Sequence, residues 1–445
     1  MIKEKDYFCV MKRAAFLSLK KWKTKEYRKP LIVYGPRQVG KTWLIQEFGK
    51  KEFQNYIYLN FEKTAGLRGI FEQDYNPERI IKILEIHSSQ KVNSGKTLVI
   101  FDEIQEAEGG LTALKYFCED RPDLHLIAAG SLLGISLARQ KSFPVGKVEF
   151  LALKPLSFLE FLSAMEEDGL RRLIEGEDLN LAKPFGAKLQ FLLKQYFFVG
   201  GMPESVQRFA QTNNFDEVRQ IHNDILNAYE RDFAKHAPGS TIPKIRAIWN
   251  SVVSQLSREN KKFVYGVVKE GARAKDYEGA LEWLESYGIV NRVYRVSKPG
   301  RPLSAYADIK AFKLYLHDVG LLCSMAGLHE KVLLHNEEMF TEFKGALTEQ
   351  FVLQELLARD RIGNQKVWYW TNPAGKAELD FIFEHAGDII PIEVKSSQNV
   401  QSKSLKIFID KYPSLHGYRA SLKPYRAEER LTNYPLFAVT RLGIS

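Results

Sequence analysis

The sequence predicts an α/β protein of several domains, with a parallel sheet in its first half and a second α/β unit at its end. Its 445 residues are more than one hydrophobic core usually organises, at about 150 residues per domain. In the first half, short apolar runs alternate with helical patterns, as in parallel sheets that helices cover on both faces. The runs expected to form strands are Leu31–Tyr34, Tyr56–Leu59, Leu98–Phe101 and Leu124–Ala129.

The chain divides into four parts. Residues 1–155 contain the four expected strands and a basic N-terminal helix, and residues 156–239 follow as a helical lid or connector. Residues 240–309 are expected to form a compact helical unit with a terminal hairpin, and residues 310–445 the second α/β unit. The elements expected in the third part are helices over Ile242–Leu256, Tyr265–Glu270 and Ala274–Tyr287, and a strand over Ile289–Val296.

The charge balance is basic, because 64 Lys and Arg residues outnumber 54 Asp and Glu residues and leave a net charge of +10. This balance favours acidic partners such as nucleotides, nucleic acid or an anionic membrane surface, and it does not determine the fold. Residues 1–29 contribute +7, from ten basic and three acidic side chains. We interpret this segment as the solvated face of a helix, with a footprint for nucleic acid or phosphate as the alternative.

Cysteine usage and hydropathy indicate in which cellular compartment the protein is expected. Cys9, Cys118 and Cys323 lie far apart, without the spacing of a metal or redox site. A disulfide framework is therefore not expected, and a cytoplasmic, reducing location fits the composition. No stretch reaches the roughly 18–20 apolar residues that cross a bilayer, so no transmembrane segment is expected.

A phosphate-binding motif connects the first expected strand to the helix that follows. The residues that fit the pattern G-x-x-x-x-G-K-[ST] are Gly35, Pro36, Arg37, Gln38, Val39, Gly40, Lys41 and Thr42. The glycines allow several backbone N–H groups to converge on phosphate oxygens. Lys41 brings a positive charge to the β- and γ-phosphates, and Thr42 offers a hydroxyl to Mg²⁺. The motif therefore predicts a site for a nucleoside triphosphate with magnesium.

Two acids end the third expected strand and complete this site. Asp102 is placed where it can hold Mg²⁺, directly or through water, and Glu103 can orient and deprotonate an attacking water. Lys41 and Glu103 are therefore the expected catalytic pair. Ser131 follows the fourth strand, where its hydroxyl either senses the γ-phosphate or serves as an ordinary turn residue.

These motifs, in this order, resemble a family of prokaryotic AAA-type P-loop ATPases whose ATPase domain precedes a C-terminal domain of uncharacterised function. The segments that carry the resemblance are Gly35–Thr42, Asn60–Glu62, Asp102-Glu103, Lys154–Phe158 and Gly200–Glu204. The resemblance implies that ATP and magnesium bind Lys41, Thr42, Asp102 and Glu103. It also implies that residues 240–309 form a winged helix and that the protein assembles as a homo-oligomer, either a ring or a dimer.

One departure from the family pattern is visible. Where a Gly-Arg pair that acts as an arginine finger is expected, this chain has Gly146-Lys147. Arg139 and Arg231 are the substitutes that the sequence offers.

A second group of acids lies near the C-terminus, on two runs that alternate as strands do. Asp380 lies on the first run, and Glu393 and Lys395 share one face of the second. If Ala386-Gly387 forms a two-residue turn, Asp380 faces Glu393, whereas a turn at Gly387-Asp388 makes Asp380 face Lys395. Either register gathers the two acids and the lysine on one face.

Glu349 adds a third carboxylate from a helix expected between Glu342 and Arg359, where it lies on the apolar face. A buried carboxylate is costly unless it is paired or bound to a metal. The set resembles the D…E-x-K signature of restriction-endonuclease-like folds. The resemblance implies that Glu349, Asp380 and Glu393 hold Mg²⁺ and that Lys395 stabilises charge or activates water. A purely structural salt bridge is the competing interpretation.

Two functions follow from these patterns. The first is a cytoplasmic Mg²⁺-dependent ATPase whose nucleotide state repositions a DNA-directed, nuclease-like C-terminal domain. The alternative is a nucleotide-dependent switch for protein–protein interaction, with a C-terminal domain that does not cleave. The helix expected over Ala274–Tyr287, which would be the recognition helix of the winged helix, supports the alternative. It carries acids that work against a phosphate surface, namely Asp276, Glu278, Glu282 and Glu285. If the unit binds DNA, the backbone contacts are expected from the segments that flank this helix. The basic residues there are Lys261, Lys262, Arg292, Arg295, Lys298 and Arg301.

Overall fold

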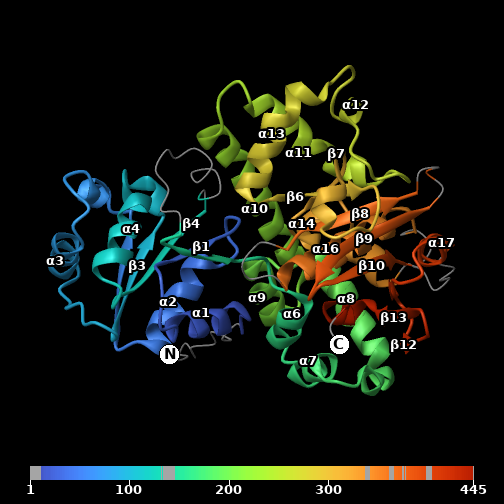
Figure 1. Ribbon diagram of the computed structural model, residues 1–445, viewed down its shortest axis with the longest axis horizontal. Helices are drawn as coiled ribbons and strands as arrows, with labels where there is room; N and C mark the ends of the chain where they lie inside the picture. Colours follow the sequence, from blue (N-terminus) through green and yellow to red (C-terminus); the bar gives the residue numbers. More distant parts are fainter. Residues whose placement is uncertain are drawn as a thin grey trace.

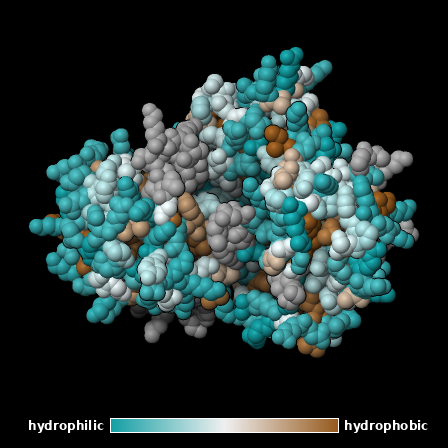
Figure 2. All heavy atoms as spheres, viewed as in Figure 1, coloured by the Kyte–Doolittle hydropathy of each residue, from teal (hydrophilic) through white to brown (hydrophobic). Residues whose placement is uncertain are grey.

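The computed structural model describes residues 12–131, 133, 146–335, 341–359, 365–372, 375, 377–396 and 403–443. These residues form two β-sheets, one toward each end of the chain, with helices between and around them (Figure 1). The face shown in Figure 2 is mostly hydrophilic, with hydrophobic residues in small separated groups. In the described part of the chain, no helix is long and apolar enough to cross a membrane.

The first sheet has five parallel strands in the order β2-β3-β4-β1-β5. The four strands expected from the sequence are present, as β1 (Leu31–Tyr34), β2 (Asn55–Asn60), β3 (Thr97–Asp102) and β4 (His125–Gly130). A fifth strand, β5 (Glu149–Ala152), was not expected from the sequence; it has only four residues and pairs with β1 at the edge of the sheet. The predicted parallel α/β fold is confirmed.

Helices cover both faces of this sheet. Those on one face are α1 (Ala15–Lys23) and α2 (Lys41–Glu52), and those on the other are α3 (Pro77–Ser88) and α4 (Gly110–Asp120). Val33 packs into the core beneath α1 and α2, whereas its neighbour Ile32 packs into the core beneath α3 and α4. Because both faces are buried, the strands carry the continuous apolar runs that the sequence shows.

A group of helices follows the first sheet, as expected for residues 156–239. They are α6 (Phe158–Ala164), α7 (Asp168–Glu175), α8 (Gly186–Val199), α9 (Pro203–Thr212) and α10 (Phe215–His236). α6 begins at a capping box, in which Ser157 and Glu160 satisfy each other's backbone N–H groups. The Gly200-Gly201 turn separates α8 from α9 and lies against Leu156.

Three helices and a hairpin occupy the next part of the chain, close to the expected positions. They are α11 (Ile242–Leu256), α12 (Tyr265–Val268), α13 (Ala274–Tyr287), β6 (Val290–Val296) and β7 (Ala307–Leu316). β6 also pairs in parallel with β8 (Val367–Thr371), so the hairpin belongs to the C-terminal sheet. The boundary expected between residues 309 and 310 therefore falls inside β7 and separates no folding units.

The second sheet is mixed and has the order β12-β13-β11-β10-β9-β8-β6-β7. Its remaining strands are β9 (Glu378–His385), β10 (Asp388–Val394), β11 (Gly417–Ser421), β12 (Arg426–Ala427) and β13 (Leu431–Pro435). The helices of this region are α14 (Val319–Met325), α15 (Glu330–His335), α16 (Thr341–Ala358) and α17 (Lys403–Lys411). α16 packs on Phe381 and Ile392, and α17 packs in a separate core with Trp370 and Ile382, so the two helices cover opposite faces.

The β9–β10 hairpin adopts one of the two registers that the sequence left open. His385 pairs with Asp388, and the pairs continue to Phe381 with Ile392. The turn is Ala386-Gly387, and both residues have positive φ, as a two-residue hairpin turn requires. The next opposed residues are then Asp380 and Glu393.

Candidate functional site

The phosphate loop lies between β1 and α2, and two glycines are needed to form it. A side chain at Gly35 would put its Cβ 2.1 Å from the carbonyl oxygen of Leu153, a backbone atom that cannot move aside. Gly40 has a φ of +87° and lies against Pro203, at the start of α9. The loop is therefore packed between β5 and the helical connector.

Lys41 is buried within this loop. Its Nζ donates hydrogen bonds to the carbonyl oxygens of Gly35 at 3.0 Å and Pro36 at 2.8 Å. Burial lowers the pKa of the Lys41 ammonium to about 8, although the nearby Glu103 and Asp102 oppose this shift. The ammonium therefore lies against the backbone of the loop, and lysines of this motif pair with the β- and γ-phosphates of a bound nucleotide.

Asp102 gathers hydrogen-bond donors from β2 and α2. Its Oδ2 accepts from the Thr42 hydroxyl at 2.9 Å, the Tyr58 hydroxyl at 2.6 Å and the Asn60 amide at 3.3 Å. A hydroxyl and a carboxylate in contact are the hard oxygen ligands that Mg²⁺ prefers, so the residues present fit this metal. Sequence reasoning identified Asp102 and Thr42, but it missed Tyr58.

Glu103 is held in a defined position at the end of β3. Its backbone is left-handed, with a φ of +50°, a conformation uncommon outside glycine. Its Oε2 accepts hydrogen bonds from the Gln105 amide at 2.7 Å and the Ser131 backbone N–H at 3.1 Å. The Ser131 hydroxyl donates to Oε1 at 3.2 Å. Ser131 is therefore a partner of Glu103 and not an isolated turn residue.

Part of this set lines a cavity of about 390 Å³, namely the loop residues Arg37, Gln38, Gly40, Lys41 and Thr42, together with Glu103 and Ser131. Sequence reasoning predicted the contribution of the phosphate loop, Glu103 and Ser131. It missed the part of the wall that comes from other elements, namely Arg13, Trp43, Pro203, Glu204 and Gln207. The glutamate and glutamine lie on α9, more than 160 residues from the loop in sequence, so no local pattern could have placed them there.

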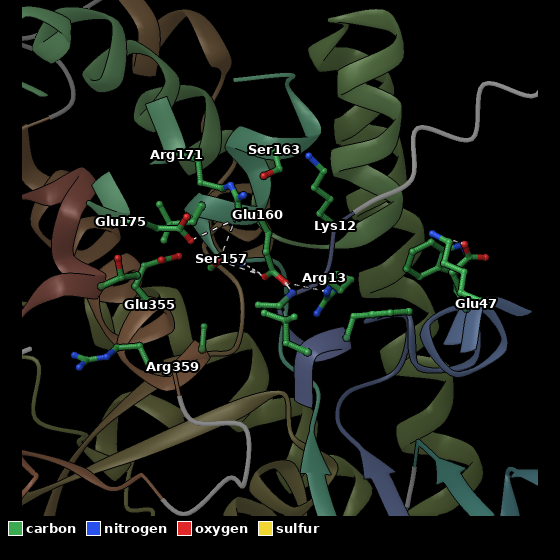
Figure 3. Close-up of a pocket in the computed structure, with 18 residues that line it drawn as sticks. Lys12, Arg13, Glu47, Ser157, Glu160, Ser163, Arg171, Glu175, Glu355 and Arg359 are labelled. Carbon is green, nitrogen blue, oxygen red and sulfur yellow. Dashed lines mark hydrogen bonds and ion pairs between the residues drawn. The ribbon is translucent and has the colours of Figure 1, made fainter. Parts of the chain in front are cut away.

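A second cavity, of about 430 Å³, adjoins the first and shares Arg13 and Trp43 with it (Figure 3). Arg13 and Glu160 are both buried and form an ion pair at 3.2 Å. Arg13 also donates to the carbonyl oxygens of Val39 at 3.3 Å and Lys154 at 2.7 Å. Arg13 therefore ties the phosphate loop to the segment before α6.

The predicted acids of the C-terminal unit are engaged by lysines. Lys313, on β7, lies 2.6 Å from Glu378, 3.6 Å from Glu349 and 3.9 Å from Asp380. Glu349 also pairs with Lys261 and accepts a hydrogen bond of 2.8 Å from the Tyr315 hydroxyl. Sequence reasoning missed Lys313 and Tyr315, because the pairing of β7 with this sheet was not expected.

The two central carboxyl groups respond in opposite ways to this environment. Burial would raise the pKa of Glu349, but the charges of Lys261 and Lys313 outweigh it and lower that pKa. Burial, and then the neighbouring Glu349 carboxylate, raise the pKa of Asp380 well above its ordinary value.

Glu393 and Lys395 form a separate pair, at 2.8 Å. Asp380 accepts a hydrogen bond of 2.7 Å from the backbone N–H of Val394. Across the described ranges, no group of three or more acidic, histidine or cysteine side chains is arranged to hold a metal ion. The predicted trio of Glu349, Asp380 and Glu393 does not fit magnesium in this arrangement, since lysines already neutralise its members.

The basic residues predicted to flank a DNA surface are also mostly paired. Arg292 is buried against Glu278 and Glu285, the second at 2.6 Å. Arg295 lies 2.6 Å from Asp308, and Lys261 forms an ion pair with Glu349. Arg292 is therefore unsuited to phosphate contacts, because its buried side chain already pairs with two carboxylates.

Of the arginine-finger candidates, Arg139 lies outside the described residues, and Arg231 is exposed on α10. Lys147, which replaces the expected arginine, pairs with Glu119 at 2.8 Å.

Three family models match parts of the chain. Residues 27–162 match the AAA domain. Residues 190–332 and 344–440 match two families described as domains of unknown function, DUF8612 and DUF4143 respectively. No curated protein matches the sequence.

Solved structures that resemble this one include a Walker-type ATPase of Pyrococcus abyssi and the ORC1 protein of Aeropyrum pernix in complex with DNA. The first is 14% identical, with a TM-score of 0.45 over 71% of this chain and 96% of that chain. The second is 13% identical, with a TM-score of 0.27 over 70% of this chain and 90% of that chain. The match to the AAA domain, the parallel sheet and the phosphate loop lead to one conclusion: this chain carries a P-loop AAA-type ATPase domain, followed by regions that match families of unknown function.

Proposed function

We propose that the protein is a magnesium-dependent ATPase in which Lys41 binds the β- and γ-phosphates and Glu103 activates the attacking water. The observation that carries this proposal is the fixed position of Glu103, which Ser131 and Gln105 hold beside the phosphate loop. Thr42 and Asp102 would hold the magnesium ion, which would neutralise negative charge on the phosphates.

Two variants test the assignment. Lys41→Ala is expected to lose ATP binding, measured by calorimetry with Mg²⁺, and Glu103→Gln to keep it while turnover falls at least about 100-fold, as loss of a general base does. Lys50→Ala, which removes an exposed lysine from the same helix, serves as the matched control. Equal hydrolysis by the wild type, Lys41→Ala and Glu103→Gln proteins would reject the proposal.

For the C-terminal unit, we propose a restriction-endonuclease-like fold that binds its partner without cutting it. The order of elements supports such a fold. α16 is followed by the antiparallel strands β8, β9 and β10, then by α17, and then by β11, which pairs with β10 in parallel. The ion pairs of Lys313 and Lys261 support the non-cleaving role, because they occupy the carboxylates that a metal would need. ATP binding would then act as a switch for this unit.

A nuclease assay separates this role from metal-dependent cleavage. Supercoiled and single-stranded DNA are incubated with wild-type protein and with Asp380→Ala, in Mg²⁺ and in Mn²⁺. We expect no nicking by either protein. Nicking by the wild type that Asp380→Ala abolishes would establish the nuclease instead, and nicking by both proteins would point to a contaminant.

For the unit formed by α11 to α13, we propose a winged-helix arrangement. We also propose that this unit binds a protein. The pairing of the buried Arg292 with two carboxylates supports this choice over DNA. Binding to duplex DNA that weakens steeply with salt would contradict it. The homo-oligomer implied by the family resemblance is tested by light scattering of the protein with ATP and with ADP.

A further inference from the structure

Arg37 is the third residue of the phosphate loop and lines the same cavity as Lys41, Glu103 and Ser131. The Lys41 ammonium contacts the carbonyl groups of Gly35 and Pro36, the two residues that precede Arg37. Because the lysine of this motif reaches the β- and γ-phosphates, Arg37 leaves the loop near the γ-phosphate end.

One carboxylate outside the ATPase sheet, that of Asp232, holds the Arg37 side chain, and two tyrosine hydroxyls support this arrangement. Its Nη1 lies 2.6 Å from Oδ1 of Asp232 on α10, and Oδ2 of Asp232 accepts a hydrogen bond of 2.5 Å from the Tyr287 hydroxyl on α13. The Tyr229 hydroxyl donates to the Arg37 carbonyl oxygen at 3.0 Å. Both the backbone and the side chain of Arg37 are thus fixed from the helical part of the molecule.

The guanidinium remains available to an anion. Among the described residues, the ion pair with Asp232 uses only Nη1, and a guanidinium has five N–H donors. The Arg37 side chain is 40% exposed, whereas that of Asp232 is 8% exposed. The carboxylate therefore anchors the arginine from the buried side while its other donors stay accessible from the cavity.

A positive charge at this place would stabilise the transition state of ATP hydrolysis. The water oxygen forms a bond to the γ-phosphorus, and the bond from this phosphorus to the β–γ bridging oxygen breaks. ADP leaves with the bonding electron pair, and the water proton passes to Glu103 and then to solvent. Negative charge is spread over the equatorial oxygens in the transition state, and an arginine that meets it accelerates turnover by about 10³–10⁵-fold. Arg37 forms no covalent bond in this step.

We propose that Arg37 is a catalytic cation that acts on the γ-phosphate of its own subunit, and that Asp232, supported by Tyr287, positions it. The inference rests on the proposed ATPase function, and it adds Arg37 to Arg139 and Arg231 as a candidate for the role that the Gly146-Lys147 departure leaves open. It also makes α13 part of the route between the helical unit and the nucleotide.

Steady-state kinetics and calorimetry on the full-length protein test the proposal. Arg37→Ala is expected to lower kcat about 100- to 1000-fold while the Kd for ATP changes less than about 5-fold, since the contact forms mainly in the transition state. Arg37→Lys is expected to recover part of the rate. Asp232→Asn and Tyr287→Phe should lower kcat by about 10-fold and 3-fold without a matching change in Kd. Lys235→Ala, on the exposed side of α10, is the control.

A mixing experiment separates action in cis from action in trans. If Arg37 acts within its own subunit, a mixture of Arg37→Ala and Lys41→Ala proteins stays inactive. Recovery of turnover in the mixture would overturn the cis assignment. Full wild-type turnover by Arg37→Ala would overturn the catalytic role alone, whereas a wild-type protein without any ATP turnover would overturn the proposed function itself. Thermal melting of each variant identifies a loss of rate that is caused by unfolding, and Arg37→Lys then gives the deciding measurement.

Discussion

Gly201 and Asp318 are joined by a buried hydrogen bond of 2.6 Å, from the glycine backbone N–H to the carboxylate. Gly201 lies in the turn between α8 and α9, and Asp318 lies between β7 and α14. The same carboxylate accepts a hydrogen bond of 3.2 Å from Gln354 on α16. Since Pro203 at the start of α9 touches the phosphate loop, this contact connects the ATPase core to the second sheet through very few residues.

Gly201→Ala should destabilise the protein. The new Cβ would lie 2.1 Å from the carbonyl oxygen and 2.8 Å from the nitrogen of Leu156, and both are backbone atoms. We expect a loss of about 1–3 kcal/mol of unfolding free energy, the usual cost of overpacking. Gly169→Ala is the control, because its Cβ meets no atom within 4 Å and α7 should tolerate alanine well. Equal urea midpoints for the two variants would contradict this prediction.

Ser131→Ala should slow ATP hydrolysis without weakening ATP binding. The change removes the hydroxyl that donates to Oε1 of Glu103 but keeps the backbone N–H bond to Oε2. A hydrogen bond is worth about 1 kcal/mol net, so kcat is expected to fall about 5-fold. Turnover and calorimetric Kd are measured beside Ser257→Ala, an exposed serine on α11's C-terminal end. A Kd that rises as much as kcat falls would place Ser131 in ground-state binding instead.

Acid should destabilise the protein in part through His222. Burial lowers the pKa of His222 to about 3, and its Nε2 lies 3.0 Å from the carbonyl oxygen of Val199. The unfolded chain takes up a proton near pH 6.5 and the folded chain does not. This group therefore stabilises the fold fully above pH 6.5, and the contribution falls by about 1.4 kcal/mol per unit as the pH decreases toward 3.

Urea unfolding at pH 7 and pH 5 measures this contribution. From pH 7 to pH 5, the free energy of unfolding of the wild type should fall by about 2 kcal/mol more than that of His222→Gln. His87→Gln, at an exposed position, should behave as the wild type does. Identical pH dependence in the wild type and His222→Gln would show that the histidine takes no part.

Lys313→Met should be among the most destabilising single changes in the second sheet. The substitution leaves Glu349, Glu378 and Asp380 without the buried ammonium between them. Breaking a buried ion pair from one side typically costs about 3–5 kcal/mol. Adding Glu349→Gln to Lys313→Met should restore part of the lost free energy of unfolding, because it removes one of the buried negative charges. Lys310→Met, at an exposed position of the same strand, is the control, and a similar loss there would argue against a special role for Lys313.

The sequence predicted those features that depend on local spacing. The phosphate loop, the acids at the end of β3 and four parallel strands follow from motifs and apolar runs of a few residues. The β9–β10 turn was reduced to two registers by turn chemistry, and the structure has the Ala386-Gly387 form. Such features could be predicted because the residues that determine them are neighbours in the chain.

Features that depend on distant partners could not be predicted. Lys313 meets Glu378 across 65 residues, and Arg37 meets Asp232 across 195 residues. An exposed lysine and a buried one look alike in a strand pattern until the neighbouring strands are known. The lysines that pair with Glu349 and Asp380 lie on β7 and before α12, in a part of the chain that the sequence assigned to another unit or to no strand.

The shared hairpin has a practical consequence for anyone who wishes to study the C-terminal half alone. A fragment that starts at residue 310 would lack β6 and the first residues of β7, and the edge of β8 would then be exposed in water with unpaired backbone groups. Open strand edges of this kind recruit other chains and aggregate. A shortened protein should therefore begin before α11, so that the hairpin and the helices packed on it stay with the sheet they complete.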